Sequence, residues 1–219
     1  MSNIARVPRT EQEVAASYTR LSKWYDRFGG SERPYISEGL RLLNAQPGER
    51  VLEIGFGTGH GLVTLAQAVG SNGRVFGLDL AAGMITVAQT QVHKAQVDDV
   101  VTLTCGSALQ LPYRDQTLDV VFSSFTLDLI DTPAIPIVLE EMRRVLRPGG
   151  RLGLVSMSKA CAANAMLKLY EWAHRHWPQL IDCRPIYLQH AVETAGFHCA
   201  GQHTRSMWGL PVEIVVATK

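Results

Sequence analysis

A glycine-rich turn between an apolar run and a helical pattern constrains this chain more than any other feature. Val51–Ile54 has the character of a short buried strand, and Gly55, Gly57 and Gly59 follow it at alternate positions. A helical pattern then begins near His60. Because glycine has no Cβ, such a turn lets a ligand approach the backbone closely, and the helix start offers unpaired N–H groups. The pattern therefore predicts a ligand site at this turn.

The acidic residues around the turn indicate which kind of ligand it holds. Asp79 ends the next apolar run, where its carboxylate can accept hydrogen bonds from both hydroxyls of a ribose. A dinucleotide fingerprint would require a third glycine where His60 stands. Glu53 lies inside the strand, and a carboxylate there suits a cofactor with a positive charge and an amino group better than a pyrophosphate. These features predict a cationic nucleoside cofactor.

Composition sets the broad class. The chain has 219 residues, 46% of them hydrophobic and 19% charged, which predicts a single globular domain over 1–219. Its net charge of +1 argues against a general electrostatic affinity for nucleic acid. It has no apolar stretch of 18 residues and no signal-peptide pattern, and its four cysteines are widely spaced. We therefore expect a cytoplasmic protein without a transmembrane segment.

Hydrophobic periodicity predicts alternating helices and strands. Helices are expected over 11–29, 35–43, 60–69, 82–95, 134–146, 162–176 and 187–195, and strands over 51–54, 75–78, 100–105, 118–123, 152–155, 197–204 and 211–217. Residues 147–150 are expected to form a turn. Alternation of this kind is typical of a parallel sheet with helices on both faces. The last two strands are joined too closely to be parallel. The prediction is an α/β fold, with a Rossmann-like, seven-stranded, mostly parallel sheet that contains one antiparallel strand.

This order of elements resembles the class I S-adenosylmethionine-dependent methyltransferases, and its motifs resemble their ubiquinone/menaquinone methyltransferase-like (type 11) group. The motifs that carry the resemblance are Tyr25-Asp26, residues 51–59, Gly77–Leu80, Gly106–Pro112, Leu118–Phe122 and Val145–Gly150. They extend over nearly the whole chain but specify no substrate. The resemblance implies an enzyme with an N-terminal helical cap over 1–46 and a substrate-side insertion over 157–196.

The resemblance also implies which residues contact S-adenosylmethionine. These are Glu53, Gly55, Gly57, Gly59, Asp79, Leu80, Met84, Ser107, Ala108, Ser124 and Tyr25. The glycines and Glu53 would hold the methionine part, and Asp79 the ribose. Leu80, Met84 and Ala108 would surround the adenine, although ordinary core packing explains Met84 equally well.

Ser107 departs from the family pattern, in which an aspartate accepts a hydrogen bond from the adenine amino group. A serine hydroxyl accepts more weakly and reaches less far. The exchange predicts a loss of about 1 kcal/mol in cofactor binding, the usual difference between a neutral and a charged hydrogen bond. The cofactor assignment is unaffected.

The sequence names no catalytic residue firmly. Asp128 follows the fourth predicted strand and is a weak candidate for a base, with helix capping as its alternative. Tyr25 and Tyr18 share a face of the first helix and are further candidates, and their alternative is core packing. His60 could face the ligand site, but a role at the start of the helix is the simpler interpretation. No metal is expected, because the His174, His176 and Cys183 spacing fits an ordinary helix face better.

The acceptor is expected to be a small molecule, hydrophobic or lipid-like, because the 157–196 insertion is rich in aromatic residues and methionine. Peripheral membrane contact is compatible with this. Arg184 and Arg205 are possible contacts for an anionic acceptor, although lone arginines are usually solvated. The alternatives are a noncatalytic S-adenosylmethionine-binding or partner-binding module and, less consistent with His60, a nicotinamide oxidoreductase. The atom that receives the methyl group and the oligomeric state stay open.

Overall fold

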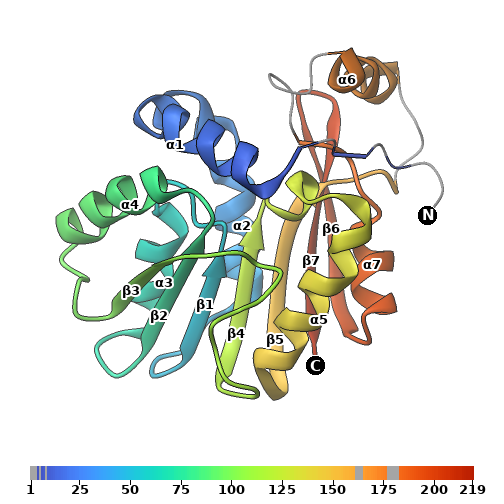
Figure 1. The fold of residues 1–219 in the computed structure, drawn as a ribbon. Coiled ribbons are helices and arrows are strands. Elements are labelled where there is room, and N and C mark those ends of the chain that lie inside the picture. Colours follow the sequence, from blue (N-terminus) through green and yellow to red (C-terminus); the bar gives the residue numbers. More distant parts are fainter. Residues whose placement is uncertain (1–3, 5, 8, 161–164, 177–182) are drawn as a thin grey trace.

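Seven strands form one sheet in the order β3-β2-β1-β4-β5-β7-β6 (Figure 1). The computed structural model describes residues 4, 6, 7, 9–160, 165–176 and 183–219, without the side chains of 23–29, 165 and 175. The strands are β1 Arg50–Ile54, β2 Arg74–Asp79, β3 Val101–Cys105, β4 Leu118–Ser124, β5 Leu146–Met157, β6 His198–Met207 and β7 Leu210–Thr218. Only β7 runs against its neighbours, pairing antiparallel with both β5 and β6. The predicted α/β fold is confirmed.

Helices cover both faces of the sheet. They are α1 Glu11–Phe28, α2 Arg33–Leu43, α3 His60–Val69, α4 Ala82–Lys94, α5 Ile135–Val145, α6 Ala165–His176 and α7 Leu188–Thr194. One apolar core lies between the sheet and α2, α3 and α4, and a second lies between the sheet and α5 and α7. The part of the predicted 162–176 helix before α6 falls outside the described residues. None of the helices described is long and apolar enough to span a bilayer.

The predicted turn at 147–150 was wrong, because these residues belong to β5. The register jumps there, since Leu118 faces Leu146 while Val120 faces Arg151. The N–H of Lys219 donates to the Gly150 carbonyl at 3.0 Å. The residue that follows β7 therefore supplies a partner that a Pro-Gly-Gly pattern cannot reveal.

Helix α1 lies beyond the carboxyl ends of the central strands, above the turn that follows β1 (Figure 1). It packs on the first turn of α4, where the Gly83 N–H donates to Thr19 Oγ1 at 3.3 Å. A Cβ at Gly83 would lie 2.8 Å from the Thr19 Cα, so only glycine permits this approach. The segment before α1 is fastened separately, since Arg6 forms a two-pronged ion pair with Asp131 and its Nη2 lies 2.7 Å from Oδ2. The N-terminal segment is thus tied to both sides of the strand ends.

Replacing Gly83 with alanine tests this packing. Since overpacking against backbone typically costs about 1–3 kcal/mol, α1 should open about tenfold more often in Gly83→Ala. Limited proteolysis within 11–28 measures that opening. Gly30→Ala is the matched control, because a Cβ at Gly30 meets nothing within 4 Å. Equal cleavage of the two variants would contradict the proposed packing role.

Candidate functional site

Each of the three glycines after β1 is required, or tolerated, for a different structural reason. All have positive φ: +70° at Gly55, +51° at Gly57 and +90° at Gly59. A Cβ at Gly55 would lie 2.0 Å from Thr126 Oγ1, and one at Gly59 would lie 2.9 Å from the Ala88 Cβ of α4. At Gly57 a Cβ meets nothing within 4 Å, and this residue lines the cavity. Gly59 is not among the lining residues, and its close approach to Ala88 gives it a packing role.

Asp79 braces the glycine turn from the end of β2. Its Oδ2 accepts from the Gly57 N–H at 3.0 Å, and its Oδ1 accepts from the Ala81 N–H at 2.9 Å. Burial raises the pKa of Asp79, while hydrogen bonds from the N–H groups of Ala81, Gly57 and Leu80 oppose that rise. A carboxylate offers about four acceptor positions, so the brace leaves acceptor capacity for a ligand.

Glu53 carries a buried acceptor atom without a partner. The residue is 2% exposed, and its carboxyl group lies against Gly61 of α3, where a Cβ would come within 2.1 Å of Oε1. Its Oε2 has no hydrogen-bond partner among the described residues. Burial, and secondarily the Asp79 carboxylate, raise the pKa of Glu53 to about 8. A cationic amino group placed here would satisfy the oxygen and favour its ionised form.

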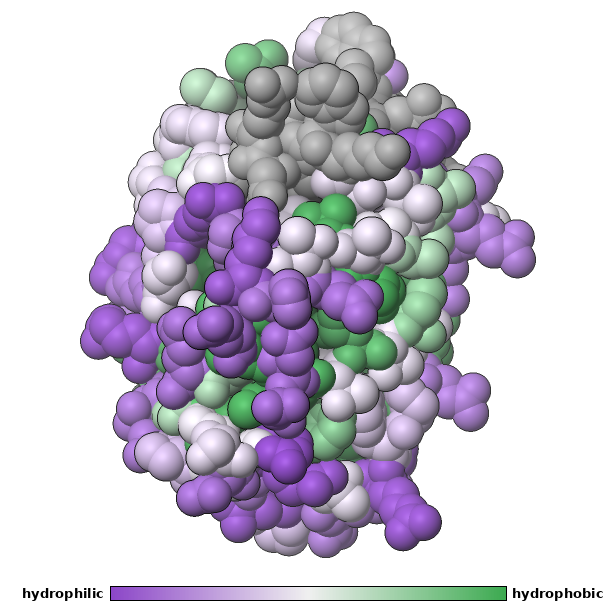
Figure 2. Space-filling model, turned by 90° about the vertical axis from the view of Figure 1, so that its left-hand side faces the viewer, coloured by the Kyte–Doolittle hydropathy of each residue, from purple (hydrophilic) through white to green (hydrophobic). Residues whose placement is uncertain are grey.

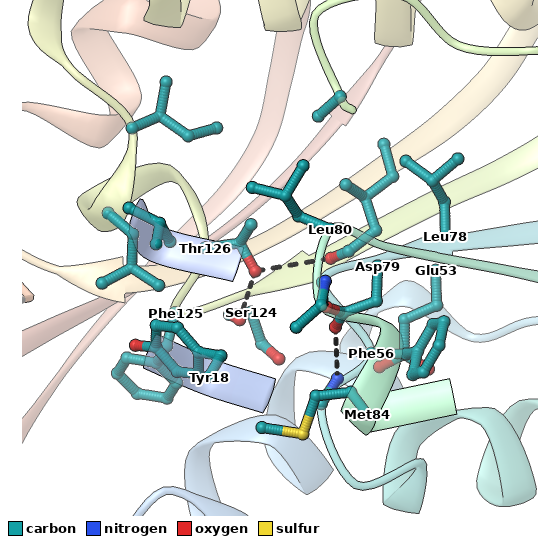
Figure 3. Close-up of a pocket in the computed structure, with 18 of the residues that line it drawn as sticks. Tyr18, Glu53, Phe56, Leu78, Asp79, Leu80, Met84, Ser124, Phe125 and Thr126 are labelled. Carbon is teal, nitrogen blue, oxygen red and sulfur yellow. Dashed lines mark hydrogen bonds between the residues drawn. The ribbon is translucent and has the colours of Figure 1, made fainter. Parts of the chain in front are cut away.

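A cavity of about 250 Å³ opens above these groups. On the side of β2 and β3 its wall is mostly apolar, formed by Leu80, Met84, Ala108 and Leu109. Figure 3 shows Met84 and Leu80 near Asp79, with Glu53 and Phe56 to one side of them. The side of the molecule turned to the viewer in Figure 2 shows apolar side chains set between hydrophilic ones. The cavity wall formed by Leu80, Met84, Ala108 and Leu109 suits a flat, weakly polar ring.

The end of β4 forms the other side of the cavity. Phe125 has φ +47°, an unusual conformation for a bulky residue that costs about 1–3 kcal/mol. Its N–H donates to the Val155 carbonyl at 2.8 Å, and Thr126 Oγ1 donates to the Ser124 carbonyl at 3.0 Å (Figure 3). These bonds hold the turn in which Ser124, Phe125 and Thr126 all line the cavity. Strain concentrated at this position is typical of a functional site.

One face of α1 roofs the cavity. Glu11, Val14, Ala15 and Tyr18 line it, at the spacing that places side chains on one side of a helix. The Tyr25 side chain lies outside the described part of the chain, so its predicted roles stay untested. Ser107 does not line the cavity, but its hydroxyl donates to Glu11 Oε1 at 2.6 Å.

His60 and Arg33 meet at the cavity wall. Arg33 Nη2 lies 2.7 Å from His60 Nε2, and both residues line the cavity. A guanidinium can only donate, so this His60 nitrogen accepts and carries no proton. The Nε2 lone pair of the ring is thereby occupied by Arg33.

The structure argues against two sequence predictions near β4. Asp128 is fully buried, is not a lining residue, and its Oδ2 accepts from the Met157 N–H at 3.3 Å. It is therefore badly placed to act as a base. Asp131 provides the helix cap, accepting from the Thr132 N–H at 2.9 Å.

The two candidate arginines have other surroundings than expected. Arg184 is 1% exposed, where the sequence suggested a solvated side chain. Its Nη2 donates to the Ile130 carbonyl, and burial lowers its pKa. Arg205 pairs with Glu38 of α2, with Nε 3.0 Å from Oε2. Neither lines the cavity.

Sequence reasoning missed Glu11, Arg33, Thr126 and Asp131 as lining residues. For Glu11 a signal existed, because it extends the periodic face of the first predicted helix by one turn. The others are brought to the cavity by contacts between distant segments, which no local pattern reports.

Comparison with known proteins identifies the family. Residues 51–150 match the methyltransferase domain model. The demethylmenaquinone methyltransferase of Lactobacillus johnsonii is 31% identical over 174 residues, covering 77% of this chain and 69% of that protein. That of Bacillus mycoides is 33% identical over 147 residues, covering 65% of this chain and 61% of that protein. The chain thus spans about three fifths of the length of some of its curated relatives.

Solved structures show the same fold. A SAM-dependent methyltransferase from Aquifex aeolicus superposes with a TM-score of 0.66 at 21% identity, over 90% of this chain and 97% of that one. The [4+2]-cyclase SpnF superposes with a TM-score of 0.79 at 18% identity, over 100% of this chain and 99% of that one. The chain belongs to the class I S-adenosylmethionine-dependent methyltransferases. Its place among them is the quinone methyltransferase-like group, as its motifs predicted.

Two alanine substitutions separate packing from ligand contact in the glycine turn. Gly59→Ala should lower the free energy of unfolding by about 2–4 kcal/mol, because positive φ and the Ala88 clash add. Gly57→Ala should lower it by only about 1–2 kcal/mol, because its Cβ meets no protein atom. Urea denaturation measures both values. Similar losses in the two variants would contradict the assignment of different roles.

Glu53 should make stability depend on pH. Because its folded pKa is raised, its contribution to stability is fully present below about pH 4.5 and is lost as pH rises through about 8. The ligand-free protein should therefore lose stability relative to Glu53→Gln across this window, by about 1.4 kcal/mol for each unit of pKa shift. Urea denaturation at several pH values checks this, with Glu140→Gln as a control at an exposed glutamate. Parallel curves for wild type and Glu53→Gln would contradict it.

Proposed function

We propose that the chain transfers a methyl group from S-adenosylmethionine to a small, lipid-like acceptor of the quinone type. Family membership supports the reaction class, and the names of the curated relatives support the acceptor class. The single observation that carries the donor assignment is the pair of acids below the glycine turn, Asp79 braced by backbone and Glu53 with an unpartnered buried oxygen.

The residues present fit this donor. Its sulfonium supplies an already electrophilic methyl carbon when bound, so the protein needs no electrophilic catalyst of its own. Asp79 has acceptor capacity left for a ribose hydroxyl, and Glu53 offers its unpartnered oxygen to the α-amino group. Because Gly57 has no side chain, the space above its backbone stays open for the methionine part of the donor.

The acceptor side of the cavity is largely apolar. Toward β4 and α5 its lining comprises Val14, Phe125, Leu129, Ile130, Ala134 and Val138. Such a wall binds an apolar ring or tail by removing its surface from water, about 25 cal/mol for each Å². It also excludes the water that would screen or solvate the reacting atoms. A hydrophobic acceptor fits this side better than a charged one.

Among the described residues, the acceptor side of the cavity offers only a weak base to remove a proton from the acceptor. The described carboxylate that lines the cavity there is Asp131, and its hydrogen bond from Arg6 lowers its pKa to about 2. Such a weak base contributes little to deprotonation at neutral pH. We infer that positioning of the nucleophile supplies most of the rate, which favours an acceptor that is already electron-rich, such as a hydroquinone.

A second candidate is a catalyst that uses the same cavity without methyl transfer. It is favoured by the superposition on the [4+2]-cyclase, which extends over the whole chain with a TM-score of 0.79. Fold alone does not determine chemistry. The weak base on the acceptor side is compatible with this candidate as well.

A labelling experiment tests the proposal. The purified chain is incubated with tritiated S-adenosylmethionine and a panel of reduced naphthoquinols with prenyl tails, simple phenols and amines. We expect label in the prenylated quinols, little in the amines, and loss of at least a hundredfold in Asp79→Ala, because the ribose hydrogen bond to a charged acceptor and the brace on the glycine turn both disappear. Thr64→Ala serves as a control on the exposed side of α3.

The outcomes separate the candidates. Binding of S-adenosylhomocysteine by calorimetry without label in any acceptor would favour the second candidate. Absence of binding to either S-adenosyl compound at millimolar concentration would overturn both.

A further inference from the structure

The first residue of α1 makes a contact that the helix itself does not need. Glu11 Oε1 accepts a hydrogen bond from the Ser107 hydroxyl at 2.6 Å, although the two residues lie far apart in the sequence. The same hydroxyl accepts from the Leu109 N–H at 3.0 Å. Ser107 is therefore oriented by its own loop and in turn holds the Glu11 carboxylate at the end of β3.

The capping of α1 is done by a different acid. Glu13 Oε2 accepts from the Thr10 N–H at 2.8 Å, and the Glu13 N–H donates to Thr10 Oγ1 at 3.3 Å. This reciprocal pair is a capping box, and it satisfies the helix start without Glu11. Glu11 shares the cavity-facing side of the helix with Val14 and Tyr18.

The apolar wall on the side of β2 and β3 ends at the Glu11 carboxylate. Gly106 and Ala108, the neighbours of Ser107, line the cavity together with Leu80 and Met84, and so does Glu11. A purine fits such a wall by its faces and needs polar partners only at its edges. Among these edges, the exocyclic amino group of adenine is a donor, and a carboxylate is a strong acceptor.

We propose that Glu11 accepts a hydrogen bond from the adenine amino group and makes the site selective for this base. The assignment rests on the proposed use of S-adenosylmethionine. Ser107 takes one of the carboxylate's acceptor positions and leaves the others available. The charged acceptor that Ser107 itself cannot provide thus comes from the N-terminal helix.

The assignment couples base recognition to closure of the roof. Glu11 belongs to the segment that Arg6 fastens to Asp131 and Thr19 fastens to Gly83. A base that pairs with Glu11 adds a further link between this segment and the sheet. A base without the amino group loses that link, and a carbonyl in its place opposes the carboxylate.

Calorimetric binding of two ligands tests the assignment: S-adenosyl-L-homocysteine and its deaminated counterpart, S-inosyl-L-homocysteine. The wild type should prefer the adenine compound by at least about tenfold, the value of one charge-assisted hydrogen bond. Glu11→Gln should reduce this preference to about twofold, because an amide can donate to a carbonyl as well as accept from an amine. The double variant Glu11→Ala/Ser107→Asp should restore much of it. Glu13→Gln, the matched control on the same turn, should change both affinities by the same factor.

Three results would overturn the assignment. If Glu11→Gln weakened binding of the adenine and the inosine compound equally, Glu11 would only fasten α1. If it changed neither affinity, Glu11 would neither recognise the base nor fasten α1. In both cases wild-type binding of S-adenosylhomocysteine leaves the proposed donor intact. Failure of the wild type to bind that compound would overturn the proposed donor and this assignment together.

Discussion

Two carboxyl groups buried beneath one backbone turn determine the shape of the site. Asp79 binds the N–H groups of Gly57 and Ala81, which joins the ends of β1 and β2 through a single side chain. Glu53 lies under Gly61 at the start of α3. Burying two acids side by side is unfavourable, and the backbone compensates only Asp79. The uncompensated Glu53 oxygen is the part of this arrangement that the proposed cationic ligand would complete.

The rest of the cavity follows from that turn. Strands β2 and β3 lie to one side of β1 and present an apolar wall, while β4 lies to the other and presents the strained turn at Phe125. The order of the strands reverses between β1 and β4, which is where open α/β sheets bind their ligands. Helix α1 lines the cavity on both sides, so its position would affect the proposed nucleoside and acceptor together.

The local part of the site was predictable. Strand, glycine turn and helix are adjacent in sequence, and the spacing to Asp79 follows from one strand–helix–strand unit. Periodicity also placed most of the elements, and the short connection between the last two strands gave the reversed direction of β7. The packing of Gly59 against Ala88 could not be predicted, because it depends on α4, which the turn's own sequence does not describe. The burial of Asp128 could not be predicted, because its neighbour Met157 comes from another strand.

By itself, then, the sequence determined the family and the sheet, because motifs and hydrophobic periodicity are local patterns that recur along the chain. It also determined the acids below the turn, because both lie within residues 51–79. Only the tertiary structure decided that Glu11 reaches Ser107, that Arg33 binds His60, and that Arg6 binds Asp131. These pairs join segments that come together only when the sheet has formed. Single exposed charges have no periodicity, so no pattern in the chain marks their partners.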